Sequence, residues 1–311
     1  MNVGAAPGVV SPRVSVIIPT YNRWPMVGEA VDSVLRQTYR SFELIVVDDG
    51  STDETCEALR RANAELQILR QSNKGVAAAR NAGARHARGK YLAFLDSDDL
   101  WLPRKLEVQT AFMERNPGVA ICQTEEIWVR RGVRVNAKAR HQKPSGDIFR
   151  RSLELCLVSP SAVMMAKDLL RRMGGFDEDF PVCEDYELWL RIAVEQMVPL
   201  IGLPLVVKRG GHADQLSYSV WGMDRFRIAA IRKLLRAGLV PEKRQWAIEA
   251  LRRKVAIVAQ GARKRGRVED AKAYEALLSG FLEEPTEDGG RADSRIRNHK
   301  SVSSTYPGAL A

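Results

Sequence analysis

The sequence "KYLAFLDSDDLW" (residues 90–101) joins an apolar segment to three aspartates, Asp96, Asp98 and Asp99. Two like charges about 4 Å apart repel by roughly 4 kcal/mol at an effective dielectric constant near 20, so such a cluster needs a cation or water to offset its charge. A bound metal ion is one such cation. The alternative is a solvated turn whose aspartates cap the following helix, and only the surrounding sequence can decide between the two.

Apolar and amphipathic segments alternate through the first half of the chain. Apolar runs predict strands at residues 14–19, 43–49, 66–70 and 90–96, and the segments between them have helical spacing. The first of these helices should bury one stripe, formed by Val27, Ala30, Val31, Val34 and Leu35. Such alternation predicts an α/β fold, a mostly parallel sheet covered by helices on both faces. Ligands of such folds bind at the carboxyl ends of the strands, where the three aspartates stand.

The second half of the chain is less regular. We expect strands near residues 119–123, 161–166 and 199–209, a hairpin at Arg131 and Gly132, and helices at 103–116, 167–175 and 185–196. Three helical segments rich in Arg and Lys follow, between residue 221 and about residue 281. We therefore expect residues 13–210 to form the α/β domain, residues 211–283 a basic helical extension, and residues 1–12 and 284–311 to be disordered.

Composition sets the broad class of the protein. Of its 311 residues 45% are hydrophobic, which is enough to bury a full core. No apolar run approaches the roughly 20 residues of a transmembrane helix, and the first residues lack the pattern of a signal peptide, so we expect a cytoplasmic protein. The net charge of +10 favours anionic partners. The cysteines form no CxxC pair and are expected to be buried thiols: Cys56, Cys122, Cys156 and Cys183.

Polar residues at the other strand ends indicate the kind of ligand. Tyr21 follows the first strand, and Asp48 and Asp49 end the second. An aromatic ring can stack on a base, a carboxylate can accept hydrogen bonds from a base or a ribose, and clustered aspartates can hold a hard divalent cation that carries phosphates. The chain lacks both the GxGxxG turn of dinucleotide-binding folds and the GxxxxGK(S/T) loop that cradles triphosphates. These residues therefore predict a site for a nucleotide diphosphate.

Six segments, in order, resemble the inverting family 2 glycosyltransferases, which have the GT-A fold. They are "VSVIIPTYNR" (14–23), "LRQTY" (35–39), "VVDDGSTDET" (46–55), "NKGVAAARNAG" (73–83), "YLAFLDSDDLWLPRKL" (91–106) and "GGFDEDFPVCEDYELWLRI" (174–192). The resemblance covers roughly residues 13–209. It implies a GT-A fold, the Rossmann-like fold of nucleotide-diphospho-sugar transferases, with the basic helices as a C-terminal extension.

The resemblance implies where the nucleotide of a sugar donor binds. In that family the tyrosine and the second aspartate of the first two motifs hold the base, and these positions are Tyr21 and Asp49 here. Pro19, Thr20 and Asp48 lie alongside them in the motifs and are expected to contribute to the same nucleotide-sugar site.

The resemblance also divides the aspartates of residues 96–99. The DxD-type positions, which flank the ribose and bind the metal ion of the donor, correspond to Asp96 and Asp98. We expect Mn2+ or Mg2+ there, with Asp98 as the first choice of ligand. Asp99 is then left to the turn that leads into the next helix. Trp101 and Trp189 stand at core-like positions and are expected to pack rather than to bind sugar.

An acid pair further along the chain stands at the family's general-base position. It consists of Glu184 and Asp185, and the resemblance implies that Asp185 is the base; by itself the pair also fits a helix start. Lys74 and Arg80 are expected to contact the diphosphate or ribose, although an exposed basic helix face has the same pattern. His212 is expected to be a further metal or phosphate contact on a glycine-rich loop, or a solvated residue.

The predicted function is the transfer of a sugar from a nucleotide-diphosphate sugar, in the first place a UDP-sugar, to a hydroxyl of a glycan or lipid-linked acceptor. It should be metal-dependent and inverting. A sugar-nucleotide nucleotidyltransferase is an alternative, but it should carry a glycine-rich loop with a basic residue where this chain has "PTYNRWP" (19–25). A second alternative is a basic, non-catalytic protein that binds membrane or nucleic acid. Such a protein does not need acidic and aromatic residues at the ends of its strands.

The basic C-terminal helices have two interpretations. Their apolar stripes alternate with arginines, which fits a peripheral contact at the inner face of the membrane, near a lipid-linked acceptor. A helical cap with a solvated basic face fits the same pattern. We expect no nucleic-acid partner.

Overall fold

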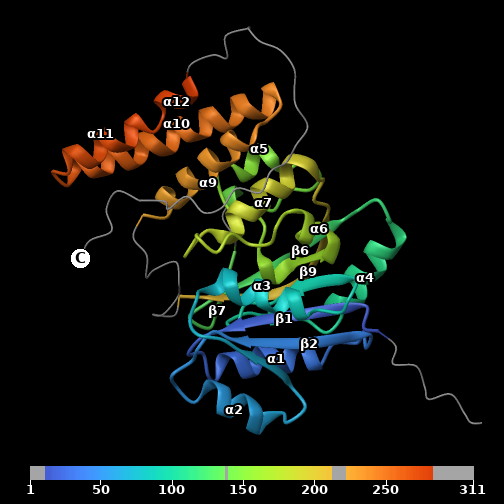
Figure 1. Cartoon of the computed structure of the whole chain (residues 1–311). Coiled ribbons are helices and arrows are strands. Elements are labelled where there is room, and N and C mark those ends of the chain that lie inside the picture. Colours follow the sequence, from blue (N-terminus) through green and yellow to red (C-terminus); the bar gives the residue numbers. More distant parts are fainter. Residues whose placement is uncertain (1–10, 137–138, 212–221, 283–311) are drawn as a thin grey trace, which may run out of the picture. The chain divides into compact units, whose positions relative to one another are not determined.

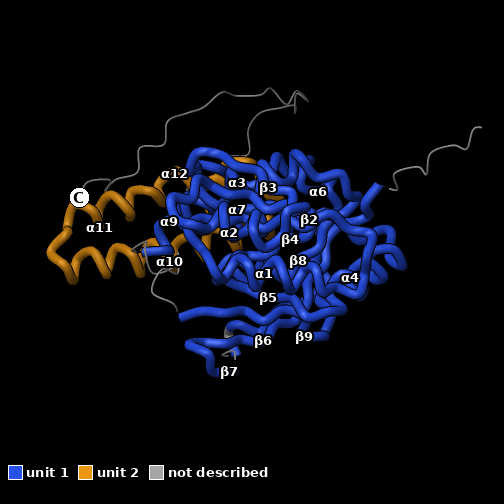
Figure 2. Tube along the Cα trace, turned by 90° about the horizontal axis from the view of Figure 1, so that it is seen from below, with its two compact units in different colours: residues 1–230 blue, residues 231–311 orange. Residues whose placement is uncertain are grey.

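The computed structural model describes residues 11–136, 139–211 and 222–282 of the chain (Figure 1). The chain divides into two compact units, residues 1–230 and 231–311, which Figure 2 shows in different colours. Disorder was predicted for residues 1–12 and 284–311. All of these residues except 11 and 12 lie outside the described part of the chain.

The first unit is built on a sheet whose first four strands in the sequence are parallel. They are β1 (Val14–Thr20), β2 (Phe42–Asp48), β3 (Gln67–Arg70) and β4 (Tyr91–Phe94). Their order across the sheet is β3-β2-β1-β4, and every pairing among them is parallel, as predicted. Thr20 is the register partner of Asp48, so the polar residues that follow these strands meet at one edge of the sheet.

The remaining strands make the other half of the sheet mixed. β8 (Val163–Ala166) runs antiparallel to both β4 and β6 (Ile121–Arg130), whereas β9 (Leu200–Gly210) runs parallel to β6. β5 (Leu100–Trp101) pairs with β9, and β7 (Val133–Val135) forms the predicted hairpin with β6. The turn residues Arg131 and Gly132 have φ angles of +50° and +77°, which suits a tight hairpin. β6 is longer than the strand predicted at 119–123 because it continues along β9.

Helices cover both faces of this sheet, as predicted for an α/β fold (Figure 1). They are α1 (Met26–Leu35), α2 (Thr55–Ala62), α3 (Val76–His86), α4 (Lys105–Arg115), α5 (Phe149–Ser152), α6 (Lys167–Arg172) and α7 (Glu184–Glu195). Two short 3-10 helices, η1 (Ala139–His141) and η2 (Pro160–Ala162), connect strands in the second half.

Alternate residues of β1 pack against different helices. Val16 and Ile18 share one core cluster with residues of α1 and α4. Ile17 faces α3, where a Cβ atom on Gly83 would lie 2.5 Å from the Cγ2 atom of Ile17. Only glycine therefore lets α3 approach β1 this closely, and α3 carries Arg80 into the site described below.

Two predictions about single side chains need correction. Leu35 was expected in the buried stripe of α1, but it is 37% exposed, because it is the last residue of the helix and lines a pocket between α1 and α2. Cys156 is only partly buried, because it lies beside a partly exposed acid of the candidate site. The other cysteines are buried as predicted: Cys56, Cys122 and Cys183.

The second unit is helical. α9 (Met223–Ala237) spans the boundary between the units in the sequence, and α10 (Pro241–Lys264), α11 (Val268–Ala276) and α12 (Ser279–Leu282) follow. α10 and α11 share a small alanine cluster, and Arg263 pairs with Glu275 at 2.7 Å. Of the three predicted segments the last is divided into two helices. No helix within the described residues is both long and apolar enough to cross a membrane.

Candidate active site

The acidic stretch, residues 96–99, follows β4 at the carboxyl edge of the sheet. The N–H of Asp96 donates to Oγ of Ser161 (3.1 Å), and the N–H of Asp99 donates to the carbonyl of Asp96 (3.0 Å), which closes a tight turn. Asp96 and Asp98 are partly exposed, whereas Asp99 is buried. The turn therefore leaves two of its carboxylates in contact with solvent.

Asp99 belongs to the turn after β4, as predicted, and its buried carboxylate also makes contacts that the sequence did not indicate. Its carboxylate accepts hydrogen bonds from Oγ of Ser161 (2.6 Å) and from the backbone N–H of Arg209 (2.9 Å). Burial raises the pKa of Asp99 well above its ordinary value, against the opposing charge of Lys208. Asp99 thus anchors the acidic stretch to η2 and β9, two elements that lie far along the chain.

Arg80 connects the acidic stretch to the acid pair. Its guanidinium forms ion pairs with Oδ1 of Asp96 (2.7 Å) and with Oε1 of Glu184 (2.5 Å), and its side chain is only 4% exposed. It also lies over the ring of Phe176, 5.2 Å from the centroid. The alternative considered from the sequence, in which Arg80 lies on an exposed basic helix face, is therefore wrong. Against the effect of burial, these carboxylates raise the pKa of Arg80, so the group stays a cation.

The two acids of the pair have different surroundings. Glu184 is the first residue of α7, is 5% exposed, and its carboxylate faces Arg80. Burial and the charge of Asp185 raise the pKa of Glu184 to about 7, although Arg80 opposes the shift. Asp185 is partly exposed. The structure thus uses Glu184 to hold Arg80 and leaves Asp185 as the more accessible acid.

Asp185 is oriented by two neighbours. Its Oδ1 accepts a hydrogen bond from the N–H of Tyr186 (2.7 Å), and its Oδ2 lies 3.4 Å from Sγ of Cys156. Burial raises the pKa of the Cys156 thiol well above its ordinary value, so the thiol keeps its proton, and its single S–H is shared between Asp185 and the carbonyl of Val158, each 3.4 Å from Sγ. The preceding residue, Cys183, has a φ of +63° and makes no side-chain capping bond. Cys183 therefore occupies the N-cap position, and Glu184 and Asp185 lie in the first turn of α7 instead of capping it.

Asp49 organises the loop that leads into α3. Its carboxylate accepts hydrogen bonds from Nε2 of Gln71 (2.7 Å) and from the N–H groups of Lys74 (3.0 Å) and Gly75 (2.8 Å). The side chain of Lys74 itself is exposed. Lys74 therefore contributes its backbone to this loop, and its predicted contact with a diphosphate stays a prediction.

The other residues of the predicted base site lie at the ends of β1 and β2. Pro19 and Thr20 are buried within β1, and the carbonyl of Thr20 accepts a hydrogen bond from the N–H of Asp49 (2.9 Å). Asp48 is buried, accepts from the N–H of Ser51 and pairs with Arg70 at 3.3 Å. Tyr21, which is 43% exposed, carries the accessible ring of the group.

The predicted metal ligands are only partly brought together. Asp96 and Asp98 lie in one turn, and Oδ1 of Asp96 is used by Arg80. His212 lies outside the described residues. Within the described part of the chain no three His, Cys, Asp or Glu side chains form a group that could hold a metal ion. Asp96 and Asp98 therefore supply two carboxylates at one turn, of which one oxygen already pairs with Arg80.

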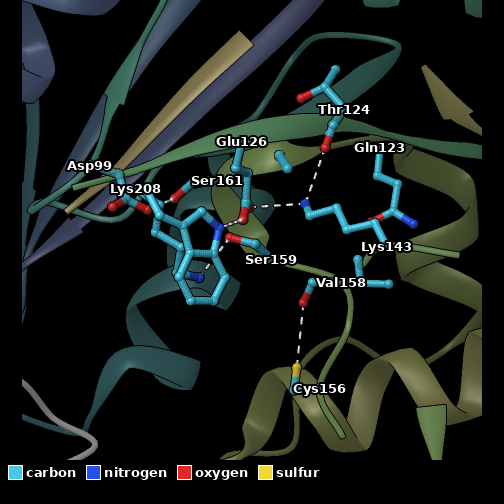
Figure 3. A network of polar contacts seen from close by, with 12 residues as sticks. Asp99, Gln123, Thr124, Glu126, Lys143, Cys156, Val158, Ser159, Ser161 and Lys208 are labelled. Carbon is cyan, nitrogen blue, oxygen red and sulfur yellow. Dashed lines mark hydrogen bonds and ion pairs between the residues drawn. The ribbon is translucent and has the colours of Figure 1, made fainter. Parts of the chain in front are cut away.

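A polar network beside the acidic stretch was missed in the sequence (Figure 3). Glu126 pairs with Lys143 at 2.9 Å, and Lys208 donates to Oγ of Ser159 at 3.2 Å. Although burial alone would raise it, the charges of Lys143 and Lys208 hold the pKa of Glu126 at about 2. The signal in the sequence was the presence of charged residues within the segments that form β6 and β9.

Trp101 and Trp189 pack in the interior, as predicted, and both are 3% exposed. The indole Nε1 of Trp101 donates to the carbonyl of Ser161 at 2.8 Å. The ring of Trp189 packs edge-on against Phe176, with centroids 6.3 Å apart. Both rings therefore support the walls of the site from within.

Comparisons with known proteins agree with this architecture. The family model described as "Glycosyl transferase family 2" matches residues 15–174. A relative from Escherichia coli, "UDP-Glc:alpha-D-GlcNAc-diphosphoundecaprenol beta-1,3-glucosyltransferase WfgD", is 31% identical over 69% of this chain and 81% of its own length. A glycosyltransferase of Rickettsia felis is 36% identical over 60% of this chain, which spans only 31% of that relative's length.

A solved structure shows the same fold. TarS of S. aureus, residues 1–349 in complex with UDP-GlcNAc, matches with a TM-score of 0.70 and 20% identity, over 86% of this chain and 80% of that chain. At this identity the likeness concerns the fold alone. Together with the family match, it means that the chain belongs to glycosyltransferase family 2 and has the GT-A fold.

Proposed function

We propose that this chain transfers a sugar from a nucleotide-diphosphate sugar to a hydroxyl group of an acceptor, with inversion at the anomeric carbon. The observation that carries the proposal is the double ion pair of Arg80 with Asp96 and Glu184. It brings the acidic stretch, proposed to hold the donor, and the acid pair, proposed to move the proton, into one site.

The donor site is assigned to the ends of β1, β2 and β4. The exposed ring of Tyr21 is available to stack on a base, and Asp49 keeps acceptor capacity beyond its three hydrogen bonds, because an ionised carboxylate has about four lone-pair sites. Pro19, Thr20 and Asp48 support them from within the strands. The donors in the names of WfgD and of the TarS complex, UDP-Glc and UDP-GlcNAc, support a UDP-sugar.

Asp185 is the proposed general base. Its carboxylate takes the proton of the acceptor hydroxyl while that oxygen attacks the anomeric carbon from the face opposite the diphosphate. The bond from the anomeric carbon to the diphosphate oxygen breaks, and its electron pair leaves with the nucleoside diphosphate. The N–H of Tyr186 donates to the carboxylate of Asp185, and the thiol of Cys156 lies 3.4 Å from it, so these two neighbours orient the side chain. Glu184 is not assigned this role because its carboxylate holds Arg80.

Asp98 and Asp96 are the proposed ligands of Mn2+ or Mg2+. In nucleotide sites Mg2+ is usually held by one or two carboxylates together with phosphate oxygens. The two partly exposed aspartates can supply these carboxylates. A divalent cation bound there supplies positive charge to the diphosphate. His212, which lies outside the described residues, is retained as a proposed further ligand.

The proposed acceptor is a glycan or lipid-linked hydroxyl compound. The support is the name of WfgD, which specifies a diphosphoundecaprenol-linked GlcNAc. The match to a glycosyltransferase family favours sugar transfer over the two alternatives considered from the sequence, a sugar-nucleotide nucleotidyltransferase and a non-catalytic binding protein.

We also propose that the second unit contacts the membrane peripherally, on its cytoplasmic side. Its helices are rich in arginine, and Val240, Ile257 and Val268 are exposed by 61%, 59% and 48%. A basic helical surface that also exposes apolar side chains suits an anionic bilayer surface.

Thermal unfolding in the presence of nucleotide sugars tests the donor site. UDP-glucose or UDP-GlcNAc should raise the Tm of the chain, because a ligand at about 100 times its Kd stabilises the folded state by about 2.7 kcal/mol. Mn2+ should enlarge the shift, and Asp98→Ala should remove this enlargement. Asp168→Ala, which removes an exposed acid of α6, is the control and should behave like the wild type. A chain that no nucleotide sugar stabilises, or an Asp98→Ala variant equal to the wild type, would contradict the proposal.

Glu184→Gln tests the electrostatics of the acid pair through folding stability. The pKa of Glu184 in the folded chain is about 7, above its ordinary value of 4.5, so the folded state binds this proton more tightly than the unfolded state. The resulting stability is present in full below about pH 4.5 and is lost as the pH rises through about 7, by up to about 3 kcal/mol. Urea unfolding near pH 5 and near pH 8 should therefore show wild-type stability falling relative to the variant. A difference in unfolding free energy between wild type and variant that does not change with pH would contradict this prediction.

Sedimentation with phospholipid vesicles tests the membrane contact. The full chain should sediment with vesicles rich in phosphatidylglycerol and stay in solution with phosphatidylcholine, because each basic residue near an anionic surface contributes about 1 kcal/mol. Ile257→Asp should reduce the sedimented fraction. Val133→Asp, at a 65% exposed apolar residue of the first unit, is the matched control and should not. No sedimentation with either kind of vesicle, or equal sedimentation with both, would contradict a contact between the basic helices and an anionic membrane surface.

A further inference from the structure

Two lysines of the network in Figure 3 differ in how their charge is balanced. Nζ of Lys143 pairs with Glu126 at 2.9 Å and also donates to the carbonyl of Thr124 at 3.1 Å. Nζ of Lys208 donates to Oγ of Ser159 at 3.2 Å, and no carboxylate of the described residues forms an ion pair with it. An ammonium group has three N–H donors, so Lys208 retains donor capacity that Lys143 has largely used.

Lys208 is tied to the acidic stretch from two sides. Its neighbour in β9, Arg209, donates its backbone N–H to Asp99 at 2.9 Å. Its partner Ser159 lies two residues before Ser161, which donates to the carboxylate of Asp99. Although burial opposes it, the nearby carboxylates raise the pKa of Lys208 above its ordinary value, so it is a cation at neutral pH.

One short segment places Lys208 between the acidic stretch and the proposed base. Within residues 156–161, Cys156 lies 3.4 Å from Asp185, Ser159 contacts Lys208, and Ser161 binds the acidic stretch. The ammonium group of Lys208 therefore contacts the same short segment that contacts the proposed proton acceptor, Asp185, and the acidic stretch. The diphosphate gains negative charge as it leaves the sugar, and a fixed cation beside it would stabilise that charge.

We propose that the ammonium group of Lys208 binds the diphosphate of the nucleotide donor and stabilises the nucleoside diphosphate as it leaves. The proposal rests on the proposed function. The acceptor proton goes to Asp185 and the electron pair of the broken bond goes to the diphosphate oxygen, so Lys208 keeps its own proton and acts through charge and hydrogen bonding. Arg80 is less suited to this role because Asp96 and Glu184 share its guanidinium. The ammonium group of a lysine binds phosphate as a compact point charge.

Binding of nucleotides to the full chain tests this assignment without any turnover. UDP, GDP and their nucleosides are titrated by calorimetry, first with EDTA and then with Mn2+, so that the effect of the ammonium group is separated from that of a metal ion. Lys208→Met and Lys208→Gln should weaken binding of the nucleoside diphosphate about ten- to hundredfold, the range of a hydrogen bond to a charged group, and leave binding of the nucleoside unchanged. Lys208→Arg should keep most of the affinity.

Lys143→Met is the matched control, because it removes the other lysine beside Glu126. It should leave the ratio of diphosphate to nucleoside affinity at the wild-type value. Wild-type affinity for the diphosphate in Lys208→Met and Lys208→Gln, or an equal loss for diphosphate and nucleoside, would overturn the assignment while leaving the proposed function intact. A wild-type chain that binds neither UDP nor GDP would instead overturn the proposed function, and this assignment with it.

Discussion

The double ion pair of Arg80 is the interaction on which the candidate site depends. One buried guanidinium holds Asp96, at the end of β4, and Glu184, at the start of α7. Removing one partner of a buried ion pair typically costs about 3–5 kcal/mol, because the remaining charge is left unpaired. The fold therefore keeps α3, the acidic stretch and α7 in one arrangement. The close packing of Gly83 on Ile17 sets how near α3, and with it Arg80, comes to the sheet.

Exposure separates the acids that hold the structure from those that are proposed to react. Glu184 and Asp99 are buried, and each is matched by a specific partner, Arg80 in one case and Ser161 with a backbone N–H in the other. Asp98 and Asp185 stand beside them and are partly exposed. Adjacent acids of the same chemical type thus take different roles, and the difference lies in their surroundings. Lys143 and Lys208 differ in their partners rather than in their exposure, because Lys143 pairs with Glu126 whereas Lys208 donates to Ser159.

Much of the fold could be predicted because it is encoded locally. Each parallel strand is an apolar run, and parallel strands end at one edge, which places Asp48 and Asp96 together without any knowledge of contacts. The role of Asp99 could not be predicted, because its partners Ser161 and Arg209 lie far along the chain and nothing in "DSDDLW" points to them. The pairing of Glu126 in β6 with Lys143, which lies outside the strands, was missed for the same reason. Leu35 was misplaced because periodicity does not show where a helix ends.

The division of roles within the acid pair is the central claim, and it is tested most directly by the rate of nucleoside diphosphate release from the sugar donor in two variants. Asp185→Asn should lower kcat by about 10²- to 10⁴-fold, the usual contribution of a general base, with little change in the KM of the donor. Glu184→Gln should lower kcat by less than about tenfold, because the base is retained. Near wild-type kcat in Asp185→Asn, or a larger loss in Glu184→Gln than in Asp185→Asn, would contradict the account.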